Sequence, residues 1–194
     1  MFRNLAEDIA YLLIKNKIVD IEKHDIYVFG VEVLLLNSLN ILTAFIVSII
    51  TGTKLHFLAF ILVFVPLRIF TGGYHAKTSE ACYLITTGTY VLSVLCVMRF
   101  PDIYSSIPGL IALSVLIVPM ILLAPIEHRN NPLSTYERKR NRLISIVLIV
   151  FDSLVFIAMF LLSNSAATSV MIFMAINSVI MLIGSLANGS IKER

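Results

Sequence analysis

The chain has 194 residues, of which 58% are hydrophobic and 14% are charged, with a net charge of +3 at pH 7. Its mean hydropathy of +0.93 is far above that of a soluble domain, and this excludes an ordinary soluble protein. The apolar residues are spread along nearly the whole chain, without a low-complexity linker. We therefore expect an all-α, polytopic integral membrane protein with a single membrane-embedded domain over residues 1–194.

The N-terminal segment, residues 1–27, has the pattern of an amphipathic helix. Leu5, Ile9 and Leu12 fall on one helical stripe, and the charged residues fall largely elsewhere. Such a helix lies in the membrane interface and does not cross the bilayer. The segment mixes acids, bases and apolar residues, unlike a secretory signal peptide, and we expect it to be retained.

Six apolar segments follow, most of them near the ~20 residues that a spanning helix needs. They cover residues 28–50, 55–70, 82–98, 108–126, 143–163 and 168–187. The second and third are the shortest. We expect a bundle of about six transmembrane helices over residues 28–187, followed by a cytoplasmic tail, residues 188–194.

The basic residues are distributed as the positive-inside rule requires. Of the 15 Lys and Arg residues, 13 fall in residues 1–27, in the connections around 68–81 and 127–142, and in the tail. The intervening loops hold the other two, so alternate connections are expected on opposite sides of the membrane. This predicts that both termini and the stretch 68–82 face the cytoplasm.

The connection before the fifth span contains a helix start and a basic cluster. Ser134 and Glu137 have the spacing of a capping box, which predicts a helix leading into that span. The basic residues after it set the topology and contact anionic lipid or, alternatively, dock an acidic partner peptide. They are Arg138, Lys139, Arg140 and Arg142.

Two polar features occur inside the first span. Asn37, Asn40, Ala44 and Ser48 recur at helical spacing, and this stripe is suited to close helix packing and compatible with a homodimer. Glu32 lies about one turn inside the span, where an ionisable group faces protein, water or a cationic partner. We therefore treat Glu32 as a candidate site residue.

The chain has two cysteines and four histidines. Cys82 and Cys96 fall on one predicted helix about 21 Å apart, too far for a disulfide. We expect Cys96 to be a small core residue and Cys82 to remain free for chemistry. The histidines show no zinc-binding pattern, so no metal or cofactor is expected, and we interpret His24, His56 and His128 as surface residues.

The stretch 68–82, RIFTGGYHAKTSEAC, places reactive side chains at the expected cytoplasmic mouth of the third span. A thiol becomes a useful nucleophile when a neighbouring base or positive charge makes the thiolate accessible. His75 is a candidate base for Cys82, and Arg68 and Lys77 make the neighbourhood electropositive. A helix that begins just before Cys82 adds the partial positive charge of its free amides.

The spacing of His75 and Cys82 imposes a geometric requirement. Seven residues of continuous helix separate them by about 10 Å, whereas direct proton transfer needs ~3 Å. If the pair works together, Gly72, Gly73 and the residues after them must form a turn that folds His75 back over the helix start. Glycine permits such a turn because it adopts backbone angles that other residues avoid.

The string R-x-x-x-G-G-Y-H-A, with a cysteine seven residues after the histidine, resembles the motif of the accessory gene regulator B (AgrB) family. Members of that family are bacterial membrane cysteine endopeptidases. The chain length, the amphipathic N-terminus and the basic connection with Asn131 and Pro132 are also similar to the family. The resemblance covers nearly the whole chain, and the central motif is its specific part.

This resemblance implies a reaction and a location. Cys82 is the expected nucleophile and His75 the general base, while Arg68 and Gly73 match positions that the family needs. Family members cut the C-terminal tail from a quorum-sensing precursor peptide, AgrD-like, and close the product as a thiolactone or lactone. We accordingly expect an enzyme of the bacterial cell membrane whose partners are that peptide and the lipid bilayer, not nucleic acid.

Other roles stay open at this level. Arg68 is a candidate to hold the acidic tail of the precursor or to stabilise the oxyanion, with a snorkelling arginine as the alternative. Glu80, Ser79 and Glu32 are candidates to orient His75.

Two other functions fit the composition. One is a small multi-pass transporter, with Glu32, Arg68 and Pro66 along its path and a helix broken at Pro119. The other is a non-catalytic membrane adaptor whose basic cytoplasmic loop binds a partner.

Overall fold

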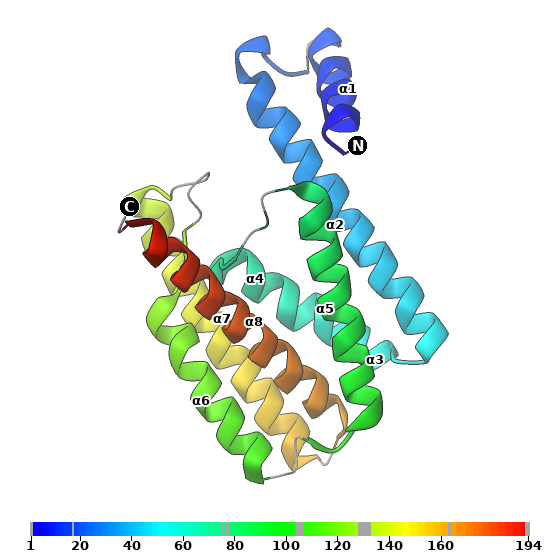
Figure 1. Ribbon diagram of the computed structural model, residues 1–194, viewed down its shortest axis with the longest axis vertical. Coiled ribbons are helices and arrows are strands. Elements are labelled where there is room, and N and C mark those ends of the chain that lie inside the picture. Colours follow the sequence, from blue (N-terminus) through cyan, green and yellow to red (C-terminus); the bar gives the residue numbers. More distant parts are fainter. Residues whose placement is uncertain are drawn as a thin grey trace. The chain divides into compact units, whose positions relative to one another are not determined.

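The computed structural model describes residues 2–16, 18–74, 76, 78–103, 107–127, 133–162 and 164–192 (Figure 1). Over these residues the regular elements are helices, and one isolated bridge of extended backbone joins Gly72 to Ile126. The chain forms two compact units, Met1–Val47 with Ala76–Val91, and Ser48–His75 with Leu92–Arg194.

The helices confirm the predicted all-α, polytopic membrane fold. Five helical segments are long and apolar enough to cross a membrane: α2, the segment Lys54–Thr71, α5, α7 and the part Ala166–Ala187 of α8. The helix α6 has 17 residues and is shorter. In chain order the elements are α1 (Phe2–Lys15), η1 (Ile21–Lys23), α2 (His24–Thr51), α3 (Lys54–Ala59), the π-helical η2 (Phe60–Phe64), α4 (Val65–Thr71), α5 (Ser79–Arg99), α6 (Ile107–Leu123), α7 (Thr135–Leu161) and α8 (Ala166–Lys192).

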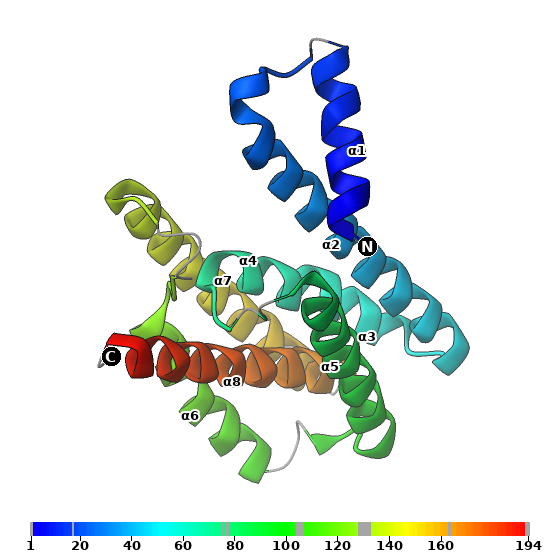
Figure 2. The same ribbon diagram turned by 45° about the horizontal axis from the view of Figure 1, so that its top comes forward.

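In the first unit α1 packs against the start of α2 (Figures 1 and 2). Ala6 and Ala10 of α1 form a buried cluster with Val28 of α2. Their small side chains allow the two helices to approach closely. Leu5 and Leu12 remain exposed, so the apolar stripe expected from the sequence is open to the membrane interface.

The helices α2 and α5 are joined by hydrogen bonds in a parallel arrangement. Asn40 accepts a hydrogen bond from the hydroxyl of Thr87 at 3.2 Å, and Glu32 accepts one from Ser79. Both pairs are 47 residues apart in the sequence, so the two helices run in the same direction. They therefore start on the same side of the membrane, which agrees with the distribution of basic residues.

The stripe of small and polar residues predicted on α2 is mostly buried. Asn40, Ala44 and Ser48 are buried, whereas Asn37 is exposed. Because Asn40 bonds to α5 of the same chain, packing within one molecule accounts for its polar group. A homodimer stays a prediction.

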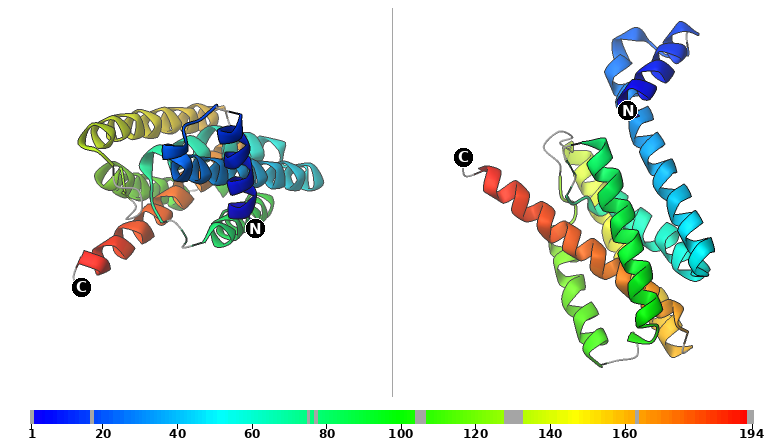
Figure 3. Two further views of the ribbon diagram at one scale, coloured as in Figure 1. Left: turned by 90° about the horizontal axis from the view of Figure 1, so that it is seen from above. Right: turned by 45° about the vertical axis from the view of Figure 1, so that its right-hand side comes forward.

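In the second unit α8 is the central element. It contacts α3, η2, α4, α6 and α7, and Figures 2 and 3 show it beside α6 and α7. Phe173 of α8 is buried, and its ring packs against those of His56, Phe60 and Phe64 with centroid separations of 4.6, 5.7 and 5.7 Å. This aromatic cluster joins the segment Lys54–Thr71 to α8.

The prediction that His56 is a surface histidine is wrong. Its side chain is 2% exposed, and its two ring nitrogens pair with the hydroxyls of Ser169 at 3.0 Å and Ser93 at 2.8 Å. These partners lie on α8 and α5, so the imidazole links three helical segments. Because both nitrogens are satisfied, most of the cost of burying a polar ring is removed.

A π-helical turn interrupts the segment Lys54–Thr71. The amide of Val65 donates to the carbonyl of Phe60, five residues earlier, where an α-helix would use a carbonyl four residues earlier. Pro66 follows directly, and its nitrogen has no hydrogen to donate. Local π-type pairing re-satisfies backbone groups near a proline inside a membrane, where water is absent.

The start of α7 confirms the predicted capping box. The hydroxyl of Ser134 accepts a hydrogen bond from the amide of Glu137 at 3.2 Å, and the carboxylate of Glu137 accepts one from the amide of Ser134 at 2.9 Å. Arg138, in the basic cluster, pairs with Glu127 at 2.6 Å. Both predicted roles of this cluster, in setting the topology with contacts to anionic lipid or in docking an acidic partner peptide, stay predictions.

Replacing His56 by alanine should lower the free energy of unfolding by about 2–4 kcal/mol, because the change opens a cavity beside Phe173 and leaves two serine hydroxyls without their partner. Thermal unfolding of the detergent-solubilised protein measures this loss. His24→Ala, at the exposed start of α2, is the control and should leave the unfolding transition nearly unchanged. Equal transitions for the two variants would contradict the packed position of His56.

Candidate active site

The stretch 68–82 is divided between the two units of the chain. Arg68–Tyr74 belongs to the second unit, and Cys82 with the start of α5 belongs to the first. His75 and Lys77 lie outside the residues that the structure describes. The geometry of each flank therefore follows from the contacts within its own unit.

On the Cys82 flank, Thr78 starts the helix. Its hydroxyl accepts a hydrogen bond from the amide of Ala81 at 3.2 Å, and its carbonyl accepts one from the amide of Cys82 at 3.0 Å. This is the pattern of a helix N-cap, and it places the half-buried Cys82 in the first turn of α5. The expected helix start just before Cys82 is confirmed, so the positive end of the helix dipole lies within one turn of this residue.

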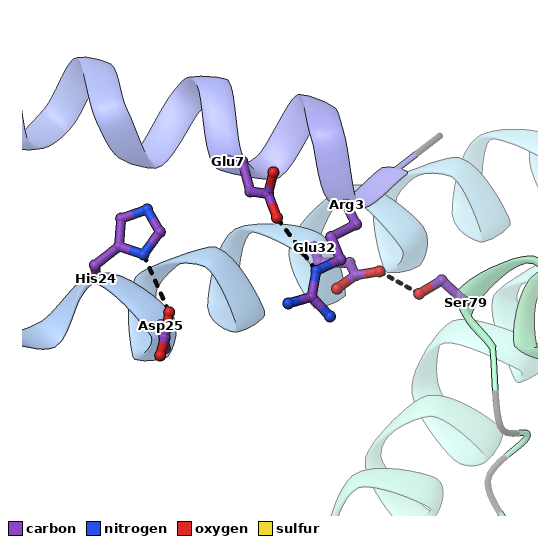
Figure 4. A network of polar contacts seen from close by, with 6 residues as sticks. All are labelled: Arg3, Glu7, His24, Asp25, Glu32 and Ser79. Carbon is purple, nitrogen blue, oxygen red and sulfur yellow. Dashed lines mark hydrogen bonds and ion pairs between the residues drawn. The ribbon is translucent and has the colours of Figure 1, made fainter.

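A hydrogen bond ties this helix start to α2 (Figure 4). The hydroxyl of Ser79, the first residue of α5, donates to a carboxylate oxygen of Glu32. Glu32 is half-buried, and Ser79 is the protein partner that an ionisable group inside a span requires. Glu80, by contrast, is exposed. A role for any of the three in orienting His75 stays a prediction.

Two further polar pairs lie near α1 (Figure 4). Arg3 pairs with Glu7 at 3.2 Å, and His24 pairs with Asp25 at 3.1 Å. The partly exposed His24 agrees with its predicted place at the surface. Exposed pairs of this kind contribute little to stability, and we assign them no part in the site.

On the other flank, Arg68 holds the turn that ends α4. Its guanidinium donates one hydrogen bond to the backbone carbonyl of Gly72 and one to that of Tyr74. A planar guanidinium presents its donors in a fixed fork, which the single ammonium of a lysine cannot reproduce. The half-buried Arg68 thus binds the backbone of its own chain.

The shape of this turn requires glycine at two positions. Gly72 has a φ of 71°, and a Cβ there would lie 2.1 Å from the carbonyl oxygen of Ile126. The amide of Ile126 donates to the carbonyl of Thr71 at 2.8 Å, so Ile126, which follows α6, lies directly against the turn. Gly73 has a φ of 127°, and a Cβ there would lie 2.4 Å from a guanidinium nitrogen of Arg68. Any larger residue would meet both a disfavoured backbone angle and a steric clash.

Comparison with known proteins identifies the family of the chain. The family model described as Accessory gene regulator B matches residues 6–183. The chain belongs to the accessory gene regulator B family. A protein of Lactiplantibacillus plantarum described as AgrB-like is 30% identical, over 69% of this chain and 68% of the relative. Another AgrB-like protein, of Clostridium perfringens, is 22% identical, over 72% of this chain and 68% of the relative.

The match confirms the resemblance drawn from the central motif. Members of the accessory gene regulator B family are membrane proteins of autoinducer peptide processing, and the apolar helices of this chain agree with a multi-pass member. No solved structure matches the chain. The matched range includes both flanks of the site, the turn at Gly72 and the helix start at Cys82.

Sequence reasoning missed one acid of this AgrB-family chain. Asp152 on α7 is 1% exposed, and neither carboxylate oxygen has a hydrogen-bond partner among the residues that the structure describes. It shares a buried helix face with Ser145, Ile149 and Phe156. The signal was present in the sequence, because an acid in the run VLIVFDSLVF is as unusual inside a span as Glu32.

The prediction that Cys96 is a core residue is wrong. Both thiols lie on α5 as expected, but Cys96 is exposed. The exposed surface of a spanning helix faces lipid, which accepts a weakly polar thiol much as a core does. His128, Asn131 and Pro132 lie outside the described residues. Within the described part of the chain, no three His, Cys, Asp or Glu side chains gather as metal ligands.

Gly72→Ala should lower the free energy of unfolding by about 3 kcal/mol or more, because the added methyl group meets the carbonyl of Ile126 at a disfavoured backbone angle. Gly52 provides the control, since its φ is 70° but no atom lies within 4 Å of an added Cβ. Gly52→Ala should cost only about 1–2 kcal/mol. Thermal unfolding in detergent compares the two variants, and equal losses would show that the contact with Ile126 has no energetic role.

Proposed function

We propose that this protein is a membrane cysteine endopeptidase that cuts an AgrD-like precursor peptide and cyclises the product. The observation that carries the proposal is the position of Cys82, in the first turn of a spanning helix of an AgrB-family chain. The turn at Gly72 and Gly73, which Arg68 holds, leads directly to His75 and supports His75 as the second member of the pair.

The proposed reaction consists of two acyl transfers. His75 takes the proton of the Cys82 thiol, and the sulfur attacks the carbonyl carbon at the cleavage position. The C–N bond then breaks, His75 gives its proton to the leaving amine of the C-terminal tail, and a thioester to Cys82 remains. An internal cysteine or serine of the precursor attacks this thioester, which closes the ring. Its proton passes through His75 to the released sulfur of Cys82.

The membrane location supports the second transfer. Exchange of one thioester for a thiolactone is close to balanced in bond energy, so competing hydrolysis by water is the main hazard. A water-poor site suppresses that side reaction. Cys82 is half-buried at the end of a span, which is a place where both the peptide and a low water content are available.

Supporting residues act on the two flanks of the site. Because both carbonyls that Arg68 binds belong to the turn before His75, we assign Arg68 to positioning His75 and not to the oxyanion. Because Ser79 and Glu32 connect the first turn of α5 to α2, we assign them to fixing the direction of the helix that carries Cys82. Rigid support of this kind is what a site with tight distance requirements needs.

The precursor is proposed to meet the enzyme at the cytoplasmic face of the bacterial membrane. The distribution of Lys and Arg supports this side for the stretch 68–82 and for both termini. The helix α1 exposes Leu5 and Leu12, which supports its position in the interface, where an amphipathic segment of the precursor can lie beside it.

A transporter is less well supported. The two charged residues that would line its path have partners, since Arg68 binds backbone carbonyls and Glu32 binds Ser79. The helix α6 also continues through Pro119, where a transporter of this kind would have a broken helix. A non-catalytic adaptor does not need the Cys82 sulfur, whereas the proposed enzyme does, so replacing Cys82 distinguishes the two functions.

Cys82→Ala should abolish tail removal from a co-expressed precursor, because the proposed thioester needs a thiol and the chain has one other cysteine, Cys96. Cys96→Ala is the matched control on the same helix and should retain cleavage within about two-fold, since its thiol is exposed and lies more than three turns away. Peptide mass spectrometry of the precursor measures both. Cleavage by Cys82→Ala at the parent rate would show that the protein is not a cysteine endopeptidase.

Arg68→Lys should lower cleavage by about ten-fold or more, because a lysine ammonium cannot hold both carbonyls in one geometry. The loss should be the same for a precursor whose acidic tail residues are replaced by their amides. A role of Arg68 in binding the acidic tail predicts the opposite, namely that the neutral-tail precursor is cut equally well by the parent and the variant. Cleavage rates for the two precursors decide between the roles.

A further inference from the structure

The turn before His75 is also held from a third direction, by the helix α8. The amide of Tyr74 donates to the carbonyl of Ile180 at 3.3 Å, although that carbonyl lies within a helix. Gly73 is buried, and a Cβ on it would lie 3.1 Å from Cγ2 of Ile180. The backbone of Gly73 and Tyr74 therefore lies directly on the surface of α8, beside Ile180.

A glycine on α8 makes this close contact possible. A Cβ on Gly184 would lie 2.6 Å from the nitrogen of Tyr74, 2.7 Å from the carbonyl carbon of Gly73 and 2.9 Å from its Cα. All three atoms belong to the backbone, which cannot move aside as the end of a flexible side chain can. Alanine at position 184 thus requires the turn to move away from α8 or the helix to shift.

The contact falls on the two residues that come directly before His75. Arg68 binds the carbonyls of Gly72 and Tyr74, and Gly184 accommodates Gly73 and Tyr74. A displacement of the Tyr74 backbone is transmitted to the next residue through one peptide bond. Proton transfer is sensitive to such a displacement of His75, since a misplacement of about 1 Å can lower the rate about a hundred-fold.

We propose that Gly184 is a positioning residue for His75, through the backbone contact that it allows between α8 and the turn Gly73–Tyr74. This inference rests on the proposed function, in which His75 is the general base. Gly184 lies about 110 residues after the motif and one residue beyond the range that the family model matches. The sequence motif alone therefore does not identify Gly184 as a site residue, because only the fold brings α8 against the turn.

A glycine that serves only helix packing would have different consequences. Its replacement would lower stability without changing the chemistry of Cys82 in the folded protein. A positioning role predicts that the folded variant binds precursor normally, turns over slowly, and has lost the effect of His75 on the Cys82 sulfur. The thiol's reactivity toward a small alkylating agent reports that effect directly.

The experiment uses the full chain with Cys96→Ala, so that Cys82 is its single thiol. Gly184→Ala is compared with Gly88→Ala, a helical glycine on α5 around which an added Cβ meets no atom within 4 Å. His75→Ala and Cys82→Ala complete the set. For each variant in detergent or liposomes, thermal unfolding and kcat and KM for precursor cleavage are measured. For the variants that keep Cys82, the rate of iodoacetamide alkylation at pH 7 is measured as well.

Gly184→Ala is expected to lower kcat by about ten-fold or more with KM within about two-fold, and to slow alkylation of Cys82 to the rate of His75→Ala. Gly88→Ala is expected to match the parent within about two-fold in every measurement. Unchanged kcat and alkylation in folded Gly184→Ala would overturn the inference, whatever its thermal stability. A rise in KM alone would overturn it as well.

If Gly184→Ala does not fold, Tyr74→Pro provides the second variant, because it removes the amide that Ile180 binds and keeps Gly184. It is expected to show the same loss of kcat and of alkylation rate, and parent-like values would overturn the inference. Failure of the proposed function is recognised separately. In that case Cys82→Ala and His75→Ala keep cleaving the precursor, whereas in a failure of the inference alone both lose activity and Gly184→Ala behaves like Gly88→Ala.

Discussion

The two hydrogen bonds from the Arg68 guanidinium to the carbonyls of Gly72 and Tyr74 are the constraint on which the site depends. The end of a helix leaves carbonyl groups without an intrahelical partner, and at the edge of a membrane, where water is scarce, partners from the protein satisfy them best. Arg68 supplies two donors from one side chain. These two carbonyls are therefore paired within the protein, and the glycines are needed because the guanidinium and Ile126 leave no room for side chains.

The two flanks of the site use different kinds of support. The sulfur is carried by a regular helix, which Thr78 caps and Glu32 ties to α2 through Ser79. The turn toward His75 is irregular backbone, which membrane proteins tolerate only where it is enclosed by protein. The proposed nucleophile thus lies on an element positioned by helix geometry, whereas the turn that precedes the proposed base is positioned by contacts with residues far away in the sequence.

Much of the fold and the central motif could be predicted from the sequence, because these depend on local patterns. Apolar length located the spans, and the spacing of Ser134 and Glu137 located the start of α7. The errors at His56 and Cys96 have a common cause. Hydropathy predicts which segments lie in the membrane, but it does not predict which face of each helix contacts protein and which face contacts lipid. The contact of Gly184 with the turn depends on the fold in the same way.

The π-helical turn Phe60–Phe64 has a consequence for the orientation of Arg68. Each such turn accommodates one residue more than an α-helical turn, so every later position is offset by about 100° around the helix axis. A helical wheel continued from Lys54 through the whole span consequently assigns Arg68 to a face that it does not occupy. The helical wheel has to be started again at Val65, and the direction of the Arg68 side chain depends on an irregularity that ends about one helical turn before it.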